Sequence, residues 1–469
     1  MDIYLTNTAS RKKEKFIPIK EGEVGIYSCG PTVYWNQHIG HMYAYTQWDI
    51  LVRFLRLVGY KATWVMNITD VGHMTSDEDA GEDKMEKGAK REGLDVWQLA
   101  QKYIDQFKDS MILLNIKFPD ILCRATDHIE DQINLIKKIE ANGFTYKTKV
   151  GLVFDTSKFP DYPKFANLDL NAQKAGARVE VDPEKKNPWD FLLWVTGQPN
   201  HIMQWDSPWG RGFPGWHIEC TAMSVRYLGE NFDIHTGGKE HIPVHHTNEI
   251  AQGYGAFGHQ TANFWIHNEW LTLKGGEKMS KSKGNFITVQ EIKEKGIDPL
   301  ALRYLFMGSH YRKGLEFSWE SLQAASVALS KIRLQAEALR QEKSREVLSS
   351  EKLAKLESFR EKFILSLADD LNIPSALGVV WEMLKSNIPS PDKYDLLLFF
   401  DDVLGLKLGQ TSVLEIPDDI KALAEKRAYL RQKGLFEEAD KVRAEIESKG
   451  YGVKDLPDKT EVYPLIKNA

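Results

Sequence analysis

Cysteine is scarce in this sequence, where positions 29, 123 and 220 hold the only three among 469 residues. So few cysteines exclude a disulfide framework and are typical of a reducing compartment, so we expect a cytoplasmic protein. No apolar run approaches the length of a membrane span, which predicts a protein without a membrane partner. Residues 1–5 lack the basic and apolar segments of a signal peptide.

A strong charge of one sign is also missing, since the net charge is −5 at pH 7. This balance excludes a general electrostatic attraction for nucleic acid. An RNA-binding surface would need local basic patches, such as residues 84–91, residues 312–313 and the arginines of the C-terminal tail. Each patch taken alone is better explained as an ordinary solvated surface.

Short apolar segments alternate with helix-like segments in the first part of the chain. Residues 25–28 and 62–67 are typical of buried strands, and similar segments return at 232–235 and 265–267. This alternation predicts an α/β fold with a Rossmann-type parallel sheet that is split by an insertion. Beyond residue 317, apolar residues recur every three or four positions, which predicts a helical bundle and then a small C-terminal domain.

Changes in composition and in pattern divide the chain into six expected segments. Residues 216–228 form a predicted helix in the second half of the sheet domain, and the last fifty residues are expected to form a helix pair with a short tail. The segments are the first half of the catalytic domain (1–115), a connective insertion (116–205), the second half with a lysine-rich loop (206–285), a linking helical region (286–330), the helical bundle (331–408) and the C-terminal region (409–469).

Two basic motifs lie far apart in the sequence, His38-Ile39-Gly40-His41 and Lys278-Met279-Ser280-Lys281-Ser282. The first motif falls where a predicted strand gives way to a helix, and the start of a helix favours phosphate. The second motif lies in a glycine-flanked loop whose ammonium groups can follow charge on a triphosphate. Together the motifs predict one nucleotide site that is assembled from both halves of the sheet domain.

Cys29 follows the first predicted strand, and Cys220 lies in the predicted helix further along. In another predicted helix, His245 and Glu249 stand at i and i+4 and His246 and Glu249 at i and i+3, so either histidine could share a face with the carboxylate. Two thiolates, an imidazole and a carboxylate would suit a tetrahedral zinc site. The alternative is that the cysteines pack as small hydrophobic residues and that the histidines are a surface or core pair.

Longer sequence words surround these motifs, namely residues 27–34 (YSCGPTVY), 67–70 (NITD), 214–220 (PGWHIEC) and 277–285 (EKMSKSKGN). The two basic motifs resemble the signatures of class I aminoacyl-tRNA synthetases. With the surrounding words they resemble the cysteinyl-tRNA synthetase family. The resemblance runs from about residue 3 to about residue 463 and keeps the order and spacing of the words.

This resemblance implies that the protein activates L-cysteine with ATP, accompanied by Mg²⁺, and transfers it to the 3′-terminal adenosine of tRNA(Cys). It also implies one zinc ion per chain on the positions matching Cys29, Cys220, His245 and Glu249. A zinc ion can bind the thiolate of the substrate, and a serine hydroxyl competes poorly for that place. The metal would therefore select the amino acid, and no His-Glu-x-x-His pattern points to a metalloprotease.

The resemblance further assigns roles to single residues in the two substrate sites. Thr69 and Trp216 match positions that line the amino-acid pocket, although Trp216 could also be a core residue. The expected state of the protein is a monomer. The remaining assignments are catalysis by His38, His41, Lys278 and Lys281, ATP binding by Gly40, Gly238, Glu240, Ser280 and Ser282, and anticodon contacts by Arg431, Phe436, Asp440 and Asp455.

Some positions depart from the usual words of the family. Phe213 stands where arginine is common, Val244 where proline is common and Glu269 where glycine is common, and Glu240 replaces an aspartate. Residues 72–82 form a stretch longer than in some relatives. None of these departures removes a proposed zinc ligand or a signature lysine.

Two other functions compete with this interpretation. A cysteine ligase of mycothiol biosynthesis would share the adenylation domain and the zinc pocket, but it would not need the tail beyond Leu408. A non-catalytic paralogue that only binds RNA would not need intact His38, His41, Lys278 and Lys281.

Overall fold

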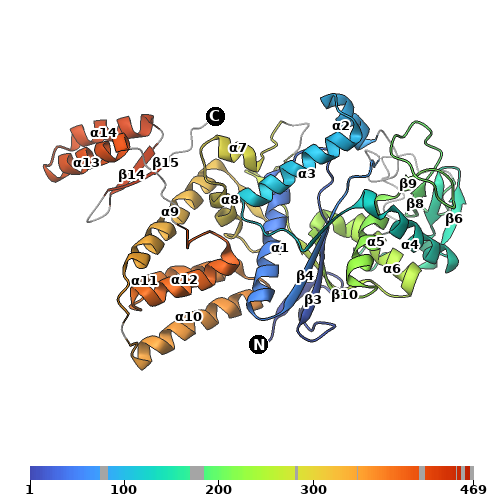
Figure 1. The fold of residues 1–469 in the computed structure, drawn as a ribbon, viewed down its shortest axis with the longest axis horizontal. Coiled ribbons are helices and arrows are strands. Elements are labelled where there is room, and N and C mark those ends of the chain that lie inside the picture. Colours follow the sequence, from blue (N-terminus) through green and yellow to red (C-terminus); the bar gives the residue numbers. More distant parts are fainter. Residues whose placement is uncertain are drawn as a thin grey trace.

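The structure, a computed structural model, describes residues 1–73, 83–169, 184–279, 284–345, 347–410, 418–449, 451–455 and 460–464. At its centre is a five-stranded parallel sheet with the strand order β11-β10-β3-β4-β5 (Figure 1). Its strands are β3 (Glu23–Ser28), β4 (Lys61–Ile68), β5 (Ile121–Arg124), β10 (Phe232–Gly238) and β11 (Ala262–Asn268). The order reverses at β3, and ligands of such sheets bind beyond the carboxyl ends of the strands at this point.

The middle strands are apolar on both faces, as strands of a covered parallel sheet are. Ile26 and Tyr27 of β3 and Trp64 and Val65 of β4 are fully buried. Helix α1 (Ile39–Leu57) connects β3 to β4 and is buried at every position from Tyr45 to Leu55. The chain leaves the carboxyl end of β3 and enters α1 after residues 29–38. The start of α1 therefore lies at the carboxyl edge of the sheet.

A second sheet, antiparallel and four-stranded, has the order β6-β7-β8-β9. Helix α5 contacts β3 and β4 of the parallel sheet and β8 of the second sheet, so it joins the two. The elements of this part are α4 (Ile129–Ala141), β6 (Thr145–Thr148), β7 (Gly151–Phe154), β8 (Phe191–Val195), β9 (Phe213–Pro214), α5 (Trp216–Leu228) and α6 (Thr247–Phe257).

Helices dominate the remainder of the chain, and the last helix pair lies apart from the bundle at one end of the molecule (Figure 1). A strand hairpin follows that pair. The helices are α7 (Val289–Glu294), α8 (Pro299–Phe306), α9 (Trp319–Gln341), α10 (Ser350–Ala368), α11 (Ile373–Lys385), α12 (Ser390–Leu404), α13 (Asp418–Gln432) and α14 (Phe436–Ser448), and the hairpin is β14 (Tyr451–Asp455) with β15 (Thr460–Pro464).

Smaller elements complete the described fold. The N-terminal hairpin pairs β1 with β2, and β12 pairs in parallel with β13 beside the lysine-rich loop. Two further helices lie between β4 and β5. These elements are β1 (Tyr4–Asn7), β2 (Lys12–Lys15), α2 (Lys84–Glu92), α3 (Val96–Leu113), β12 (Leu271–Leu273) and β13 (Leu315–Phe317).

Two buried carboxylates hold the helical part against the sheet domain. Asp49 of α1 is fully buried and pairs with Arg53 at 2.8 Å and with the equally buried Arg303 of α8 at 2.6 Å. Asp370, at the turn after α10, accepts hydrogen bonds from the backbone N–H and the hydroxyl of Thr6 and from the Tyr311 hydroxyl. These contacts make the sheet domain and the bundle one packed body.

The predicted fold class, an α/β Rossmann-type domain followed by a helical C-terminal region, is confirmed. The predicted helix at 216–228 is also confirmed as α5. The boundaries at 115 and 205 stay predictions, but β5 lies inside the expected insertion and pairs with the parallel sheet, while β9 lies outside it and pairs with β8. The expected C-terminal helix pair is present, and the hairpin β14–β15 was not anticipated. Within the described ranges, no helix is both long and apolar enough to cross a membrane.

Candidate active site and metal centre

Helix α1 begins with the two signature histidines. His38 is its N-cap, and its Nδ1 accepts hydrogen bonds from the backbone N–H groups of Gly40 at 3.0 Å and of His41 at 3.3 Å. The His41 Nδ1 in turn accepts from the His38 N–H at 3.3 Å, and the two rings stack with their centroids 3.7 Å apart. The imidazoles therefore take the capping places at a helix terminus whose backbone N–H groups and dipole favour phosphate.

The segment around the lysine-rich loop approaches this helix terminus from the other half of the chain. The Ile39 N–H donates to the Ile287 carbonyl at 2.9 Å, and Phe286 packs edge-on against the His38 ring. Lys278 places its ammonium 3.2 Å from the centre of the Trp270 ring, a cation–π contact. Ser280, Lys281 and Ser282 lie outside the described residues, so the structure reaches the loop only as far as Met279.

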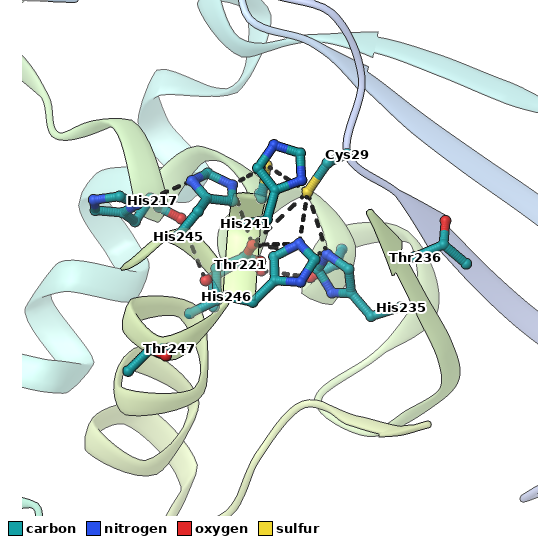
Figure 2. Close-up of polar contacts among 12 residues, drawn as sticks. Cys29, His217, Thr221, His235, Thr236, His241, His245, His246 and Thr247 are labelled. Carbon is teal, nitrogen blue, oxygen red and sulfur yellow. Dashed lines mark hydrogen bonds and ion pairs between the residues drawn. The ribbon is translucent and has the colours of Figure 1, made fainter. Parts of the chain in front are cut away.

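Cys29, Cys220, His245 and Glu249 converge at the carboxyl edge of the sheet, from four different segments. Figure 2 shows Cys29 and His245 of this group facing each other across the site. The two Sγ atoms lie 4.0 Å apart, and Cys29 Sγ lies 3.9 Å from Glu249 Oε1. His245 Nε2 lies 3.4 Å from Cys220 Sγ and 3.2 Å from Glu249 Oε1. All four side chains are buried, so the segment after β3, helix α5, the turn before α6 and α6 itself enclose one group of donor atoms.

These spacings suit a tetrahedral metal ion. Ligands about 2.0–2.3 Å from a central zinc ion stand roughly 3.3–3.8 Å apart, which is close to the separations of the four donor atoms. The Glu249 Oε2 atom is buried and finds no hydrogen-bond partner within the described parts of the chain. Two thiols, an imidazole and a carboxyl with one oxygen that lacks a partner form a donor set that fits zinc.

A second group of donors shares Cys29 and Glu249 with the first. His235 of β10 and His246 place their Nε2 atoms 3.5 Å and 3.1 Å from Cys29 Sγ. A π-helical turn over Ile242–His246 precedes α6, so His245 and His246 lie in this turn and not, as the sequence predicted, in the first residues of a regular helix. Both His245 and His246 therefore reach Glu249 Oε1, at 3.2 Å and 3.8 Å. The sequence left the choice between these histidines open, and the geometry brings both to the cluster.

Burial controls the ionisation of this cluster. It raises the pKa of the Cys29 and Cys220 thiols and of the Glu249 carboxyl, and it lowers the pKa of His245 and His246. Each shift favours the neutral form of its group. A dication at the centre would offset this effect, so its binding would release protons from the thiols.

Further histidines orient the inner ones. The Nδ1 atoms of His217 and His245 lie 2.9 Å apart, so one donates to the other. Similarly His246 Nδ1 lies 2.6 Å from His267 Nε2, and His267 Nδ1 lies 2.7 Å from the Thr8 hydroxyl. Partners of this kind fix which ring nitrogen of a ligand faces the metal. His217 stands in the PGWHIEC word, three residues before Cys220, which was the one sequence signal for its place here.

The two residues assigned to the amino-acid pocket lie next to this cluster. The Trp216 ring has its centroid 4.6 Å from that of His245, and Lys84 of α2 lies 5.6 Å from the centre of the Trp216 ring. Thr69 follows β4, and its hydroxyl donates to the buried Glu219 at 2.9 Å. Glu219 was not among the residues singled out from the sequence, because nothing in its spacing distinguishes it from a surface carboxylate.

The other assigned residues are distributed over two regions. Gly238 ends β10, and Glu240 accepts a hydrogen bond from the Trp270 indole at 2.8 Å, close to the lysine-rich loop. The anticodon candidates lie far from this region, on the C-terminal unit. There Arg431 stacks over the exposed Phe436 ring at 5.7 Å, with Asp440 on α14 and Asp455 in β14, its side chain outside the described part.

Comparison with known proteins places the chain among the synthetases. The family described as tRNA synthetases class I (C) catalytic domain matches residues 15–327. Cysteine–tRNA ligase of Treponema denticola is 44% identical over 491 residues, covering 98% of this chain and 99% of that protein. Cysteine–tRNA ligase 1 of Burkholderia lata is 43% identical over 474 residues, covering 100% of this chain and 98% of that protein.

Solved structures share the architecture at much lower identity. A Mycobacterium tuberculosis methionyl-tRNA synthetase bound by methionyl-adenylate has a TM-score of 0.56 at 16% identity and covers 82% of this chain, 90% of its own. The LeuRS of Agrobacterium radiobacter, in a ternary complex, has a TM-score of 0.61 at 11% identity. The match covers 84% of this chain and 85% of the LeuRS chain. The fold and the catalytic-domain match together define a class I aminoacyl-tRNA synthetase.

Sequence identity to the cysteine–tRNA ligases extends over almost the full length of the chain and decides the subgroup within that class. The chain belongs to the cysteine–tRNA ligase family.

Proposed function

We propose that this protein activates L-cysteine with ATP and transfers it to the 3′-terminal adenosine of tRNA(Cys). The observation that carries the proposal is the meeting of Cys29 and Cys220 with His245 and Glu249 at the carboxyl edge of the sheet, where α1 also begins. A thiolate-binding donor set would thus stand next to a phosphate-binding helix terminus, as the activation of cysteine requires. We take the cytoplasm as its compartment, supported by three free and buried cysteines, and a monomer as its working state.

Zinc is the metal that this donor set suits, and it would be held by Cys29, Cys220, His245 and Glu249. Bound there, it would supply a soft Lewis acid that prefers the thiolate of cysteine to the hydroxyl of serine. The protein itself excludes water from the site and fixes the imidazole of His245 through His217. Discrimination by a metal bond could reach ratios at which no editing site is needed.

The ATP site would be formed by the start of α1 and the lysine-rich loop. His38 and His41 would offer their imidazole groups to the triphosphate at the Gly40 turn, while Lys278 and Lys281 would stabilise the pyrophosphate that leaves, with Mg²⁺ bound to the nucleotide. Because Gly40 has no side chain, the His38 ring and Met279 can pack against the start of α1 beside the proposed triphosphate site. The remaining proposed ATP contacts are Gly238, Glu240, Ser280 and Ser282.

The C-terminal unit would recognise the anticodon. An exposed aromatic ring at Phe436 beside the guanidinium of Arg431 suits the stacking of an unpaired base. Asp440 and Asp455 would accept hydrogen bonds from base edges. A mycothiol-type cysteine ligase would leave this unit without a role, which favours the tRNA substrate.

A combined exchange and charging assay tests the proposal. Purified protein is incubated with ATP, labelled pyrophosphate and cysteine, and in parallel with labelled cysteine and tRNA(Cys). We expect cysteine-dependent exchange and formation of cysteinyl-tRNA. Exchange without charging would favour the small-molecule ligase, and the absence of both reactions would favour a protein that only binds RNA.

A further inference from the structure

The fully buried carboxylate of Glu219 lies between two side chains at the edge of the amino-acid pocket. Its Oε2 accepts from the Thr69 hydroxyl at 2.9 Å, and its Oε1 lies 2.6 Å from His73 Nε2. Thr69 is 2% and His73 8% exposed, so the three groups form a buried polar unit. Burial raises the pKa of this carboxyl, whereas His73 and the Thr69 hydroxyl act in the opposite direction and favour the carboxylate.

The hydrogen bonds around Thr69 fix the direction of its hydroxyl proton. The Gly30 N–H donates to Asn67 Oδ1 at 2.7 Å, so the amide nitrogen of Asn67 points the other way and donates to the Thr69 Oγ1 at 3.1 Å. Thr69 thus accepts from Asn67 and donates its only proton to Glu219. Any further partner of this hydroxyl must be a hydrogen-bond donor.

The polar unit is attached to both cysteines of the cluster. Glu219 directly precedes Cys220 on α5, and Gly30 directly follows Cys29. A ligand whose thiol meets Cys29 and Cys220 therefore has its neighbouring atoms close to Thr69. In an amino acid with a thiol on Cβ, the α-ammonium is three covalent bonds from the sulfur, and it is a donor with a positive charge.

Resting on the proposed function, we propose that Glu219 is a positioning residue that selects thiol ligands carrying an adjacent primary ammonium group. It does so by keeping the Thr69 oxygen an acceptor and by placing a negative charge behind it. His73 holds the second carboxylate oxygen. The His73 carbonyl also accepts from the Lys84 N–H at 2.9 Å, so the described residues on either side of positions 74–82 meet at this point.

Three thiol ligands separate this role from a purely structural one. L-Cysteine and cysteamine carry the ammonium group, whereas 3-mercaptopropionate lacks it. Each is titrated by calorimetry into the zinc-loaded full-length protein. In the Glu219→Gln variant we expect the Kd of the two ammonium ligands to rise about 10- to 100-fold, since hydrogen bonds to charged groups have this strength. The Kd of 3-mercaptopropionate should stay within about twofold of wild type or fall, because a negative charge near its site has been removed.

Glu230→Gln is the matched control, since it makes the same chemical change on the exposed surface just after α5, where Glu230 pairs with Lys138 at 3.1 Å. It should leave all three Kd values unchanged. Thr69→Val provides the coupling test, because Glu219 is expected to act through this hydroxyl. The double variant should then bind cysteine no more weakly than Thr69→Val alone. Should Glu219→Gln not fold, His73→Asn is expected to give the same ligand-dependent loss in weaker form.

Equal losses for all three ligands, or fully additive effects in the double variant, would overturn this role and leave the proposed function standing. Wild-type protein that binds none of the three thiols would overturn the proposed function together with this inference.

Discussion

Gly40 of the histidine motif lies against Met279 of the lysine motif. A Cβ atom added at position 40 would stand 3.3 Å from the terminal methyl of Met279 and 2.8 Å from the His38 ring. Two motifs more than two hundred residues apart in the sequence are therefore in contact, and only hydrogen fits between them.

Replacing Gly40 by alanine should impair the ATP site without affecting the fold. The new methyl group would displace the His38 ring or the Met279 side chain, and a shift of this size at a reacting group can cost about 100-fold in rate. We expect the rate of cysteine-dependent pyrophosphate exchange to fall by that order, with cysteine binding unchanged. Gly378→Ala on α11 is the control, since a Cβ there would meet nothing within 4 Å. Exchange at the wild-type rate in Gly40→Ala would contradict the proposed site.

Replacing Cys220 by serine should remove the metal and the preference for cysteine. We expect metal analysis of the purified variant to find no stoichiometric zinc, because a serine hydroxyl is a poor zinc ligand. The ratio of kcat/KM for cysteine to that for serine should fall by at least about 100-fold. Cys123→Ser is the control, since Cys123 is buried outside the cluster and contacts the Met66 carbonyl. If Cys220→Ser keeps its zinc and its preference, the selection hypothesis is wrong.

The imidazole of His217 should matter for metal affinity although it is not one of the four proposed ligands. Burial lowers the pKa of His217 to about 3, so the ring is neutral and can accept the Nδ1–H of His245. We expect His217→Leu to weaken zinc binding about 10- to 100-fold in competition with a chelator. The exposed His259→Asn should bind zinc like wild type, and an unchanged affinity in His217→Leu would show that His245 is oriented by other contacts.

The buried carboxylate of Asp49 should be a major source of stability. Asp49→Asn leaves the guanidinium groups of Arg53 and Arg303 buried without their counter-ion, which costs about 3–5 kcal/mol. Urea denaturation should show a correspondingly lower free energy of unfolding. The exposed pair of Lys138 and Glu230 provides the contrast, because Glu230→Gln should change this free energy by less than about 1 kcal/mol.

Glu92 predicts a pH-dependent contribution to stability. Burial raises its pKa, but hydrogen bonds from Arg91, Lys102 and Tyr103 outweigh this effect and hold the pKa at about 2, below the ordinary 4.5. The carboxylate therefore stabilises the folded protein above pH 4.5, and this contribution disappears as the pH falls from 4.5 to 2. We expect Glu92→Gln to lose roughly 1 kcal/mol at pH 7, since the group is partly exposed to solvent. Thermal unfolding of the two proteins should converge in acid, and a constant difference across this range would contradict the assignment.

Local sequence signals predicted much of the fold and part of the site. Buried strands and the helix at 216–228 follow from apolar patterns that act over a few residues, and the helix start at His38 follows from its place after a strand. His235 could not be assigned in this way, because its distance to Cys29 depends on β10 lying beside β3. The bond from Thr69 to Glu219 spans 150 positions of sequence and likewise depends on how α5 packs.

The C-terminal hairpin illustrates the same limit at the level of secondary structure. Tyr451–Asp455 has few apolar residues, so its alternation is too weak to predict a strand. The π-helical turn before α6 was equally invisible, since a helix with one widened turn keeps the composition of a regular one.

The contact of Thr6 with Asp370 has a consequence for the order of folding during synthesis. Thr6 is synthesised before its acceptor Asp370, which follows 364 positions later. At about 5–20 residues per second, the N-terminal hairpin is made roughly 20–70 s before the carboxylate that fastens it. A nascent chain that has already formed its sheet domain must therefore hold Thr6 of β1 without this partner until the end of α10 has emerged.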